Sequence, residues 1–383
     1  MRAKNKKTTF RNLLRQVIFA TNIVAIALLL CSLLSWRVSP LKTNLFSYLG
    51  LGFGVILLLN ICYLLFWVLL SKWKHALISL AAILLCYQPT TTFFPLHLFP
   101  KKVPDGTVKI LTYNVQGFPK ESRKESDRHP ILEYIARTDA DIVCLQEYFV
   151  SKTGHSIITQ KDVNRILIQY PYRSVTGLES SGKYHTYGLA CFSKYPIEKQ
   201  HEVVFPSSYN GAAIYTINIR GKRYTVANVH LESNRIKAED KKMYSDFLLN
   251  NESVKLEQVT QNIRNRMGRA YRIRSGQVKQ VKQYIATQHT EGVILCGDFN
   301  DTPISNAYYE MKKGLKDAYA SAGFGPGITY HEDLFLFRID FIMHSKRIKA
   351  YQSKVDRIPF SDHYPLRSYL MLESEQKDNR TRR

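Results

Sequence analysis

The sequence predicts an α/β or α+β sandwich, with two packed β-sheets and helices outside them, preceded by transmembrane helices. Three observations lead to this fold class. The first 100 of the 383 residues hold ten Lys or Arg, no Asp or Glu, and three long uncharged apolar stretches. After them, short apolar runs typical of buried strands recur between polar segments. Two longer segments of that second part have a helical pattern.

The three uncharged stretches are expected to form a membrane domain over residues 16–99. The first apolar run is too long for a cleaved signal peptide, so it is expected to remain as an anchor. Gln88, Pro89 and three threonines interrupt the third stretch, so two spans followed by an interfacial segment is the alternative. Because a bilayer core needs about 20 apolar residues in a helix, the expected spans are about residues 16–36, 46–70 and 76–98.

Basic residues predict the orientation, because cytoplasmic loops carry an excess of Lys and Arg. Residues 1–15 hold six of them and are expected to be a basic cytoplasmic N-terminus. The loop with Arg37 and Lys42 would lie outside, and Lys72 and Lys74 would lie inside. With three spans the next domain emerges on the outer, periplasmic or extracytoplasmic face, whereas with two it stays in the cytoplasm. We expect an integral membrane protein with the outer arrangement.

Seven apolar runs after residue 100 are predicted strands, and most of them read as buried on both faces. Helices are expected at His129–Arg137 and within Ser253–Gln288. The elements define a domain over about residues 105–373, and the polar, basic residues 374–383 are expected to be a disordered tail. In chain order the strands are residues 108–115, 140–147, 188–193, 212–219, 224–231, 292–299 and 338–345.

The net charge of residues 101–383 limits the kinds of partner that this part of the chain would bind. Residues 101–383 hold 44 basic residues and all 31 acidic ones, a net charge of +13. Such a domain suits an anionic substrate or an acidic membrane surface, without choosing between nucleic acid and phospholipid. The six cysteines form no CxxC pair and have no zinc-type histidine spacing, so neither a structural zinc site nor a disulfide framework is indicated.

Polar residues occupy the ends of the predicted strands or the positions just beyond them. Carboxylates at the ends of buried strands are costly unless a cation or a hydrogen-bond network satisfies them. Strand ends that meet at one rim are also where β-rich enzymes assemble their sites. The sequence therefore predicts one shared site from Asn114, Glu147, His230, Asp298, Asn300, Asp340, Asp362 and His363.

Six short motifs that contain these residues resemble the endonuclease/exonuclease/phosphatase superfamily in their order. They are YNVQGF (113–118), LQE (145–147), NVHLES (228–233), GDFND (297–301), RIDFI (338–342) and SDH (361–363). The resemblance covers essentially residues 107–372 and none of the first 100. It implies a four-layer α/β sandwich of two packed mixed β-sheets flanked by helices. The family includes deoxyribonucleases, abasic-site endonucleases, inositol-polyphosphate 5-phosphatases and bacterial sphingomyelinases.

The resemblance implies a divalent-metal site at one side of the rim. Glu147 is expected to be the principal Mg²⁺ ligand, with Mn²⁺ as the alternative ion, because Mg²⁺ prefers oxygen ligands. Asn114 and Asp362 are expected beside this metal. Gln116 stands where a branch of the family has an acidic residue, so a second carboxylate ligand would be missing. Gln116 is expected to contact substrate, and whether one or two ions bind is left open.

The resemblance also implies catalytic roles. Asp298 and Asn300 are expected to handle the attacking water, since residues two apart in an extended segment project to the same face. The Asp340–His363 pair would stabilise charge developing on the phosphoryl oxygens, and His230 would hydrogen-bond phosphate. Whether Asp298 or His363 takes the proton of the water stays open.

Two further residues are expected to touch substrate. Tyr187 opens a strand segment common in the family, and Arg269 lies in an arginine-rich stretch, residues 264–282. That stretch could face an anion, such as a lipid headgroup or a polyanionic substrate, or it could be a solvated helix face.

The function predicted from these features is a membrane-anchored, Mg²⁺-dependent phosphoester hydrolase, with water attacking phosphorus. One alternative is a membrane-anchored metal-dependent nuclease, and another is a non-catalytic module that binds phosphate or lipid. The predicted partners are an anionic phosphoester substrate and a lipid bilayer, the latter through the N-terminal helices. The sequence indicates no protein partner.

Overall fold

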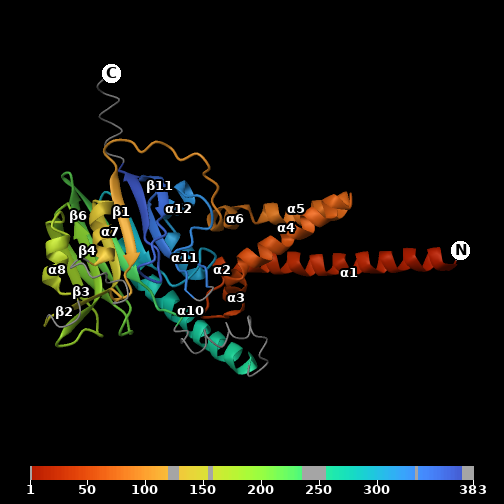
Figure 1. The fold of residues 1–383 in the computed structure, drawn as a ribbon, viewed down its shortest axis with the longest axis horizontal. Helices are drawn as coiled ribbons and strands as arrows, with labels where there is room; N and C mark the ends of the chain where they lie inside the picture. Colours follow the sequence, from red (N-terminus) through yellow and green to blue (C-terminus); the bar gives the residue numbers. More distant parts are fainter. Residues whose placement is uncertain (1, 120–128, 154–157, 235–255, 333–334, 373–383) are drawn as a thin grey trace, which may run out of the picture. The chain divides into compact units, whose positions relative to one another are not determined.

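The computed structural model describes residues 2–119, 129–153, 158–234, 256–332 and 335–372 (Figure 1). The chain forms two compact units. The helical unit comprises Met1–Phe93 together with Pro303–Tyr309, and the sandwich unit comprises Phe94–Thr302 together with Glu310–Arg383. Residues 303–309, which lie within the expected domain of residues 105–373, pack with the helices, and the expected domain bounds stay a prediction. The expected disordered tail, residues 374–383, lies outside the described residues.

Six helices build most of the helical unit. The segment Phe10–Arg37 is long and apolar enough to cross a membrane. The next two helix pairs pass the same test only when each is counted as one span bent by 64° or 66°, so one to three segments of the described residues could cross a membrane by length and composition. The bounds are α1 Arg2–Ser32, α2 Leu34–Arg37, α3 Leu45–Leu51, α4 Phe53–Leu69, α5 Trp73–Leu85 and α6 Tyr87–Phe93.

The third expected span, residues 76–98, is divided in the structure. Its helices α5 and α6 are separated at Cys86, and α6 ends at Phe93, so residues 94–98 lie outside them. Pro89 falls in the first turn of α6, where a missing backbone N–H removes no helical hydrogen bond. The break therefore precedes the proline rather than coinciding with it.

Buried polar contacts connect the helices of this unit. The Asn22 side chain of α1 accepts hydrogen bonds from Trp67 Nε1 of α4 at 2.9 Å and from Ser79 Oγ of α5 at 3.1 Å. Asn60 Nδ2 of α4 donates to the Ala25 carbonyl at 3.0 Å. Hydrogen bonds of this kind link helices in apolar surroundings, where side-chain polar groups have few other partners.

The sandwich unit contains two six-stranded sheets. Their strand orders are β11-β12-β1-β2-β4-β3 and β5-β6-β7-β8-β10-β9. The pairs β1–β2 and β7–β8 are parallel, and all other pairs are antiparallel, so both sheets are mixed. The strands are β1 Val108–Asn114, β2 Ile142–Ser151, β3 Tyr172–Gly177, β4 His185–Ser193, β5 Ile197–Val204, β6 Gly211–Ile219, β7 Lys222–His230, β8 Val293–Asp298, β9 Leu315–Asp317, β10 Asp340–Ser345, β11 Lys349–Val355 and β12 Leu366–Met371.

Helices flank the sheets (Figure 1). Residues of α7 and α8 pack with one face of the β1–β2–β4 region in a single buried cluster. On the other sheet, α10 lies against β5, where Tyr284 stacks on His201 at 3.8 Å. The helices of this unit and its boundary are α7 Pro130–Thr138, α8 Gln160–Ile166, α10 Leu256–Ala286, α11 Asn306–Lys312 and α12 Ala318–Ala322.

The main core lies between the two sheets. It takes side chains from the inner faces of both, including Ile110, Cys144, Val226, Ile294 and Ile342, all fully buried. Strands covered on both faces read as continuous apolar runs, which is why the seven predicted strands reappear as β1, β2, β4, β6, β7, β8 and β10. The predicted fold class, two packed mixed sheets flanked by helices, is confirmed.

Candidate active site

Three predicted site residues lie in one row across the second sheet. His230 ends β7 and pairs with Asp298 at the end of β8, and Asp298 pairs with Asp340 at the start of β10. Side chains in register on neighbouring strands point to the same face. All three are almost fully buried, at 3%, 1% and 1% exposure. Strand register therefore builds a charged row at the rim of an otherwise apolar sheet.

The first sheet contributes Asn114 and Glu147. Asn114 ends β1, and its Nδ2 donates to Glu147 Oε1 at 3.0 Å and to Asp298 Oδ2 at 3.1 Å. β2 is irregular between Leu145 and Tyr148, and such bulges redirect a side chain next to active sites. Glu147 lies in this irregularity. The Asn114 amide thus joins the metal-ligand candidate of one sheet to the central carboxylate of the other.

The segment that contains Asp362 and His363 is held against β1. Ser361 Oγ donates to the Asn114 carbonyl at 2.9 Å, and the Asp362 amide donates to Gln116 Oε1 at 3.2 Å. His363 Nδ1 lies 2.8 Å from Asp340 Oδ2, so this nitrogen carries the proton and donates to the carboxylate. The other ring nitrogen of His363 faces Asp298 Oδ2 at 3.8 Å.

Asn300 is fixed by three hydrogen bonds. Its backbone N–H donates to Asp298 Oδ1 at 2.7 Å, and its side-chain Nδ2 donates to the Leu231 carbonyl at 3.0 Å and to Asp298 Oδ2 at 3.2 Å. The Asp298 carboxylate therefore accepts hydrogen bonds from both asparagines. The motif places the asparagine beside the aspartate as the sequence predicts.

Backbone strain gathers at this rim. Gln116, Glu147 and Asn300 have φ angles of 47°, 51° and 51°. Residues other than glycine rarely adopt such left-handed angles, and each costs of the order of 1–3 kcal/mol unless its surroundings impose it. Strain of this kind concentrates at functional sites. These three angles are a signal that the sequence does not contain.

The rim also contains polar atoms without partners. Within the described residues, both ring nitrogens of His230 are buried and make no hydrogen bond, and the same holds for Asp340 Oδ1. His230 Nε2 lies 3.7 Å from Glu147 Oε1 and 3.7 Å from Asp298 Oδ2. Distances near 3.7 Å exceed direct hydrogen bonds. These groups are therefore arranged around a space that water or phosphoryl oxygens would fill.

Burial and mutual charge shift the titration of the central groups. Burial raises the pKa of Asp298 from 3.8 to about 6, with Asp340 acting in the same direction and His363 and His230 opposing it. Burial alone would lower the pKa of His363, but the carboxylates of Asp340, Asp298 and Asp362 outweigh it and raise this pKa to about 10. At neutral pH the imidazole is thus a cation and the Asp298 carboxyl is close to its titration range.

The family of this chain is shown by a match to a family model. The model of the Endonuclease/Exonuclease/phosphatase family matches residues 111–363. The chain belongs to this family. Its members are metal-dependent hydrolases of phosphoester bonds, and this chain is one of them. A second family model, a domain of unknown function, matches residues 15–93. None of the curated proteins matches the sequence at a significant level.

The chain is similar to several solved structures. The endonuclease/exonuclease/phosphatase from Beutenbergia cavernae is 17% identical over 70% of this chain and 72% of its own, with a TM-score of 0.50. A family protein from Leptotrichia buccalis is 20% identical over 69% of this chain and 99% of its own, with a TM-score of 0.48. Sphingomyelinase C from Streptomyces griseocarneus is 20% identical over 69% and 99%, with a TM-score of 0.44. At 17% identity the similarity to the Beutenbergia cavernae structure supports the fold alone.

The donors at the rim fit the divalent cation that this family uses. Burial raises the pKa of Asp362, and Glu147 raises it further, so two carboxyl groups there repel one another and a cation would relieve them. Asp298, Asp340 and His363 also present potential ligand atoms within 4.8 Å of one another. A protonated imidazole cannot bind a metal, so Glu147 with the oxygen of Asn114 and Asp362 suits the cation better.

A cavity of about 340 Å³ adjoins the rim. It is lined by Glu147, Tyr187, Tyr209, Asn210, His230 and Ser233. The rings of Tyr187 and Tyr209 meet edge to face at 5.5 Å. Tyr187 therefore lies near Glu147 and His230, the metal-ligand and phosphate-binding candidates. Its contact with substrate stays a prediction.

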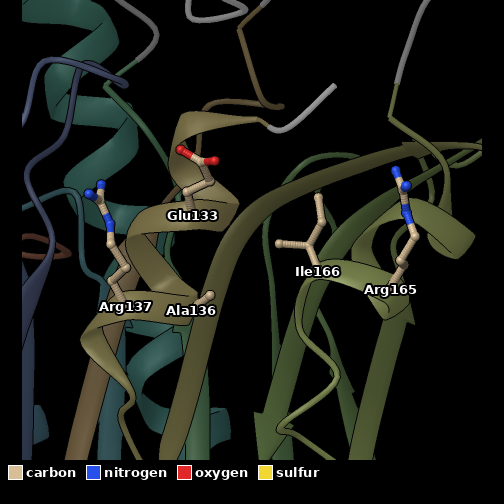
Figure 2. Close-up of a pocket in the computed structure, with 5 residues that line it drawn as sticks. All are labelled: Glu133, Ala136, Arg137, Arg165 and Ile166. Carbon is tan, nitrogen blue, oxygen red and sulfur yellow. The ribbon is translucent and has the colours of Figure 1, made fainter. Parts of the chain in front are cut away.

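Figure 2 shows a different cavity, between α7 and α8, also of about 340 Å³. Among the described residues it is lined by Glu133, Ala136, Arg137, Arg165 and Ile166. Arg137 and Arg165 are separated in the view, and no residue of the six motifs is among the five labelled. We assign the family chemistry to the rim.

Arg274, rather than the predicted Arg269, contacts the segments that follow the rim residues. Arg269 is exposed on α10 and is not among the residues that line the Glu147 cavity. Arg274, fully buried, donates to Asp301 Oδ2 at 3.1 Å, to the Glu232 carbonyl at 2.8 Å and to Asn234 Oδ1 at 3.0 Å. It thus holds the segments that follow His230 and Asn300, a role that sequence reasoning missed.

A buried amide network beneath the rim was also missed. Gln146 Nε2 donates to Asn228 Oδ1 at 2.7 Å, and Asn228 Nδ2 donates to the carbonyls of Leu145 and Ala190 at 3.0 and 3.1 Å. These bonds tie β2 and β4 to β7. Both residues lie inside quoted motifs, LQE and NVHLES, and an amide in an otherwise apolar strand was the available signal.

Proposed function

We propose that this chain is a membrane-anchored, Mg²⁺-dependent phosphoester hydrolase in which water attacks phosphorus directly. The observation that supports this best is the position of Asp298. Its carboxylate accepts hydrogen bonds from Asn300 and Asn114, and its Oδ2 lies within 3.8 Å of ring nitrogens of His230 and His363. A water at this point would meet a base, orienting amides and two phosphate-binding imidazoles together.

Asp298 is proposed as the general base. A base works best with a pKa near the operating pH, and burial raises the pKa of Asp298 to about 6. His363, with a pKa raised to about 10, is already protonated at neutral pH and cannot accept the proton. Asn300 would orient the water from the neighbouring position. Of the two candidate bases that the sequence left open, Asp298 and His363, these pKa values favour Asp298.

The two histidines are proposed to stabilise the transition state. His363, held by Asp340 at 2.8 Å, would place a fixed positive charge against the phosphoryl oxygens. His230 would donate to another phosphoryl oxygen, which would satisfy a ring nitrogen that has no partner in the described structure. When bound by Glu147, Asn114 and Asp362, Mg²⁺ supplies Lewis-acid polarisation of a phosphoryl oxygen and stabilises the leaving group.

A membrane-borne phosphodiester is the proposed substrate class. The apolar segment Phe10–Arg37 supports anchoring, and an anchored enzyme meets a lipid substrate at high effective concentration. The net charge of +13 over residues 101–383 suits an anionic headgroup. We further propose the outer-face arrangement with three spans. A nuclease on the same anchor is the outcome that the test below must separate.

The test uses the full-length chain in lipid nanodiscs. Hydrolysis of bis-p-nitrophenyl phosphate, phospholipid and sphingolipid vesicles, and plasmid DNA is measured with Mg²⁺, with Mn²⁺ and with EDTA. His230→Ala and Asp298→Ala should lower kcat by about 10²-fold or more. Asp105→Asn, an exposed carboxylate of the same unit, is the matched control and should leave kcat unchanged.

Each result has a defined meaning. Metal-dependent activity on vesicles that exceeds activity on DNA, and that the two site variants lose, supports the lipid proposal. A preference for DNA would replace it with the nuclease. Folded protein that binds Mg²⁺ yet hydrolyses none of these substrates would refute the substrate class, and activity that survives EDTA would refute the metal dependence.

A further inference from the structure

A short piece of the family domain packs inside the helical unit. The chain leaves the sandwich unit after Thr302 and re-enters it at Glu310, and the residues between, Pro303–Tyr309, belong to the helical unit. Ile304 is fully buried there in a cluster with Leu29, Trp36, Phe53, Leu57 and Cys86. The family model covers this piece. Its packing against helices that lie outside the matched range is therefore a property of this chain.

Directed contacts hold the piece in place. Trp36 Nε1 donates to the Pro303 carbonyl at 2.9 Å, and Ser35 Oγ donates to the Ile304 carbonyl at 2.6 Å. In return, Asn306 Nδ2 donates to the Trp36 carbonyl at 3.1 Å. The Trp36 ring also stacks on Tyr309 at 5.4 Å and 15°. Ser35 and Trp36 are buried, so losing either hydrogen bond would leave a buried carbonyl unpaired.

Gly50 of α3 makes the fit close. A Cβ atom added at Gly50 would lie 2.3 Å from Ser35 Oγ and 2.5 Å from the Ile304 carbonyl oxygen. Both distances are shorter than real contacts of a Cβ atom, and the second neighbour is backbone. Substitution of Gly50 must therefore displace Ile304 or the helix. Gly52, two residues further on, differs, because its nearest neighbour would lie at 3.6 Å.

The piece directly follows the residues proposed to handle water. Asn300 stands three positions before Pro303 and has a φ angle of 51°, a strained conformation that only its surroundings can maintain. Asp301, between them, is held by the buried Arg274, and its Oδ1 accepts from the Thr302 amide at 3.0 Å. The strand β8 fixes one end of this segment, and the hydrogen bonds of Pro303 and Ile304 to Trp36 and Ser35 fix the other.

We infer that Ser35, Trp36 and Gly50 are positioning residues for catalysis, because they clamp the chain immediately after Asn300. The inference rests on the proposed function, in which Asp298 and Asn300 hold the attacking water. Their hydrogen bonds to Pro303 and Ile304 then support the segment that carries Asn300. Loosening the clamp should lower kcat, since a small misplacement of a catalytic group has a large effect on rate, and should leave KM nearly unchanged.

The test compares matched variants of the full-length protein in nanodiscs, with bis-p-nitrophenyl phosphate as substrate. Trp36→Phe keeps an aromatic ring but removes the hydrogen bond to the Pro303 carbonyl. Gly50→Ala places a Cβ atom too close to the Ile304 carbonyl oxygen. Trp67→Phe removes an equivalent buried indole hydrogen bond, to Asn22, in the same unit. We expect kcat to fall about threefold to tenfold for Trp36→Phe and more for Gly50→Ala, with KM within twofold.

Gly52→Ala and Trp67→Phe should retain the wild-type kcat. Hydrogen exchange provides a second readout that does not depend on turnover. Amides of the segment from Phe299 to Ile304 should exchange faster in Trp36→Phe and Gly50→Ala, while those of β7 and β8 stay protected. Faster exchange of the whole sandwich unit would indicate unfolding instead, and would overturn the positioning role.

The two ideas fail in different ways. Active wild type whose clamp variants and controls share one kcat and one exchange pattern would refute the inference and leave the proposed function intact. Wild type that is inactive on every phosphodiester would refute the proposed function, and the inference with it. A parallel fall of kcat in Trp67→Phe would show that general damage to the helical unit, rather than the clamp, affects the rate.

Discussion

Replacing Asp298 by Asn should reveal a conflict between catalysis and stability. The raised pKa of Asp298, about 6 against 3.8 for an ordinary aspartate, means that the folded protein disfavours the ionised carboxylate. Such a group contributes stability that is fully present below its unfolded pKa and is lost as the pH rises through its folded pKa. The ionised Asp298 therefore lowers the free energy of unfolding of the wild-type protein at neutral pH, whereas a neutral Asn at this position does not.

The magnitude follows from the two pKa values. One pH unit is worth about 1.4 kcal/mol, so the cost of the ionised Asp298 is on the order of 3 kcal/mol above pH 6 and vanishes below about pH 4. The Asn amide would also oppose the donors of Asn114 and Asn300, which costs stability. That second cost does not depend on pH, so the comparison must be made as a function of pH.

The assay is the difference in unfolding free energy between wild type and Asp298→Asn, measured in EDTA by denaturant titration from pH 4 to pH 7. Asp105→Asn serves as the control for removal of a carboxylate. The difference should move in favour of the variant by about 3 kcal/mol across this range, with most of the change between pH 4 and pH 6. A flat difference, or one that moves toward wild type, would refute the reasoning from burial.

Three further predictions concern other parts of the site. Gly297→Ala should destabilise the sandwich unit by on the order of 3–5 kcal/mol in thermal or denaturant unfolding. The reason is that Gly297 has a φ of 138° and that an added Cβ would lie 1.9 Å from the Val229 carbonyl oxygen. An unchanged unfolding midpoint would contradict this. Arg274→Met should lower the free energy of unfolding by about 3–5 kcal/mol, because it leaves Asp301 charged and buried. Adding Asp301→Asn should recover part of this loss. If the effects of the two substitutions are strictly additive in the double variant, the result counts against the pairing. Glu147→Gln should weaken Mg²⁺ binding by at least about tenfold in isothermal titration, and equal affinity would exclude Glu147 as principal ligand.

Much of the site was predictable because its residues lie at the ends of strands with a strong local pattern. Central strands such as β1, β7 and β8 are covered on both faces, so most of their residues are buried and many are apolar, and the polar residue at the end stands out. Asn114, His230 and Asp298 were found in this way. The family resemblance then supplied their roles, which the structure accommodates and does not test.

The edge strands were missed for the converse reason. β5, Ile197–Val204, exposes most of its residues, and β11, Lys349–Val355, is only partly buried. Edge strands of this kind carry charged and polar side chains that avoid pairing with other molecules. Their composition is therefore close to that of a loop, and only hydrogen bonding to β6 and β12 makes them strands.

The sequence by itself determined the two-part organisation, the central strands and the set of chemically competent side chains, because apolar runs and strand-end polar residues are local properties. Only the tertiary structure decided that Arg274 of α10 is buried and Arg269 is exposed. The reason is that the burial of Arg274 depends on its contacts with the segments that follow β7 and β8. The tertiary structure also decided that Trp36 packs with Pro303, 267 residues away. Contacts between such distant positions leave no periodic pattern in one sequence, because they arise from how already formed elements pack.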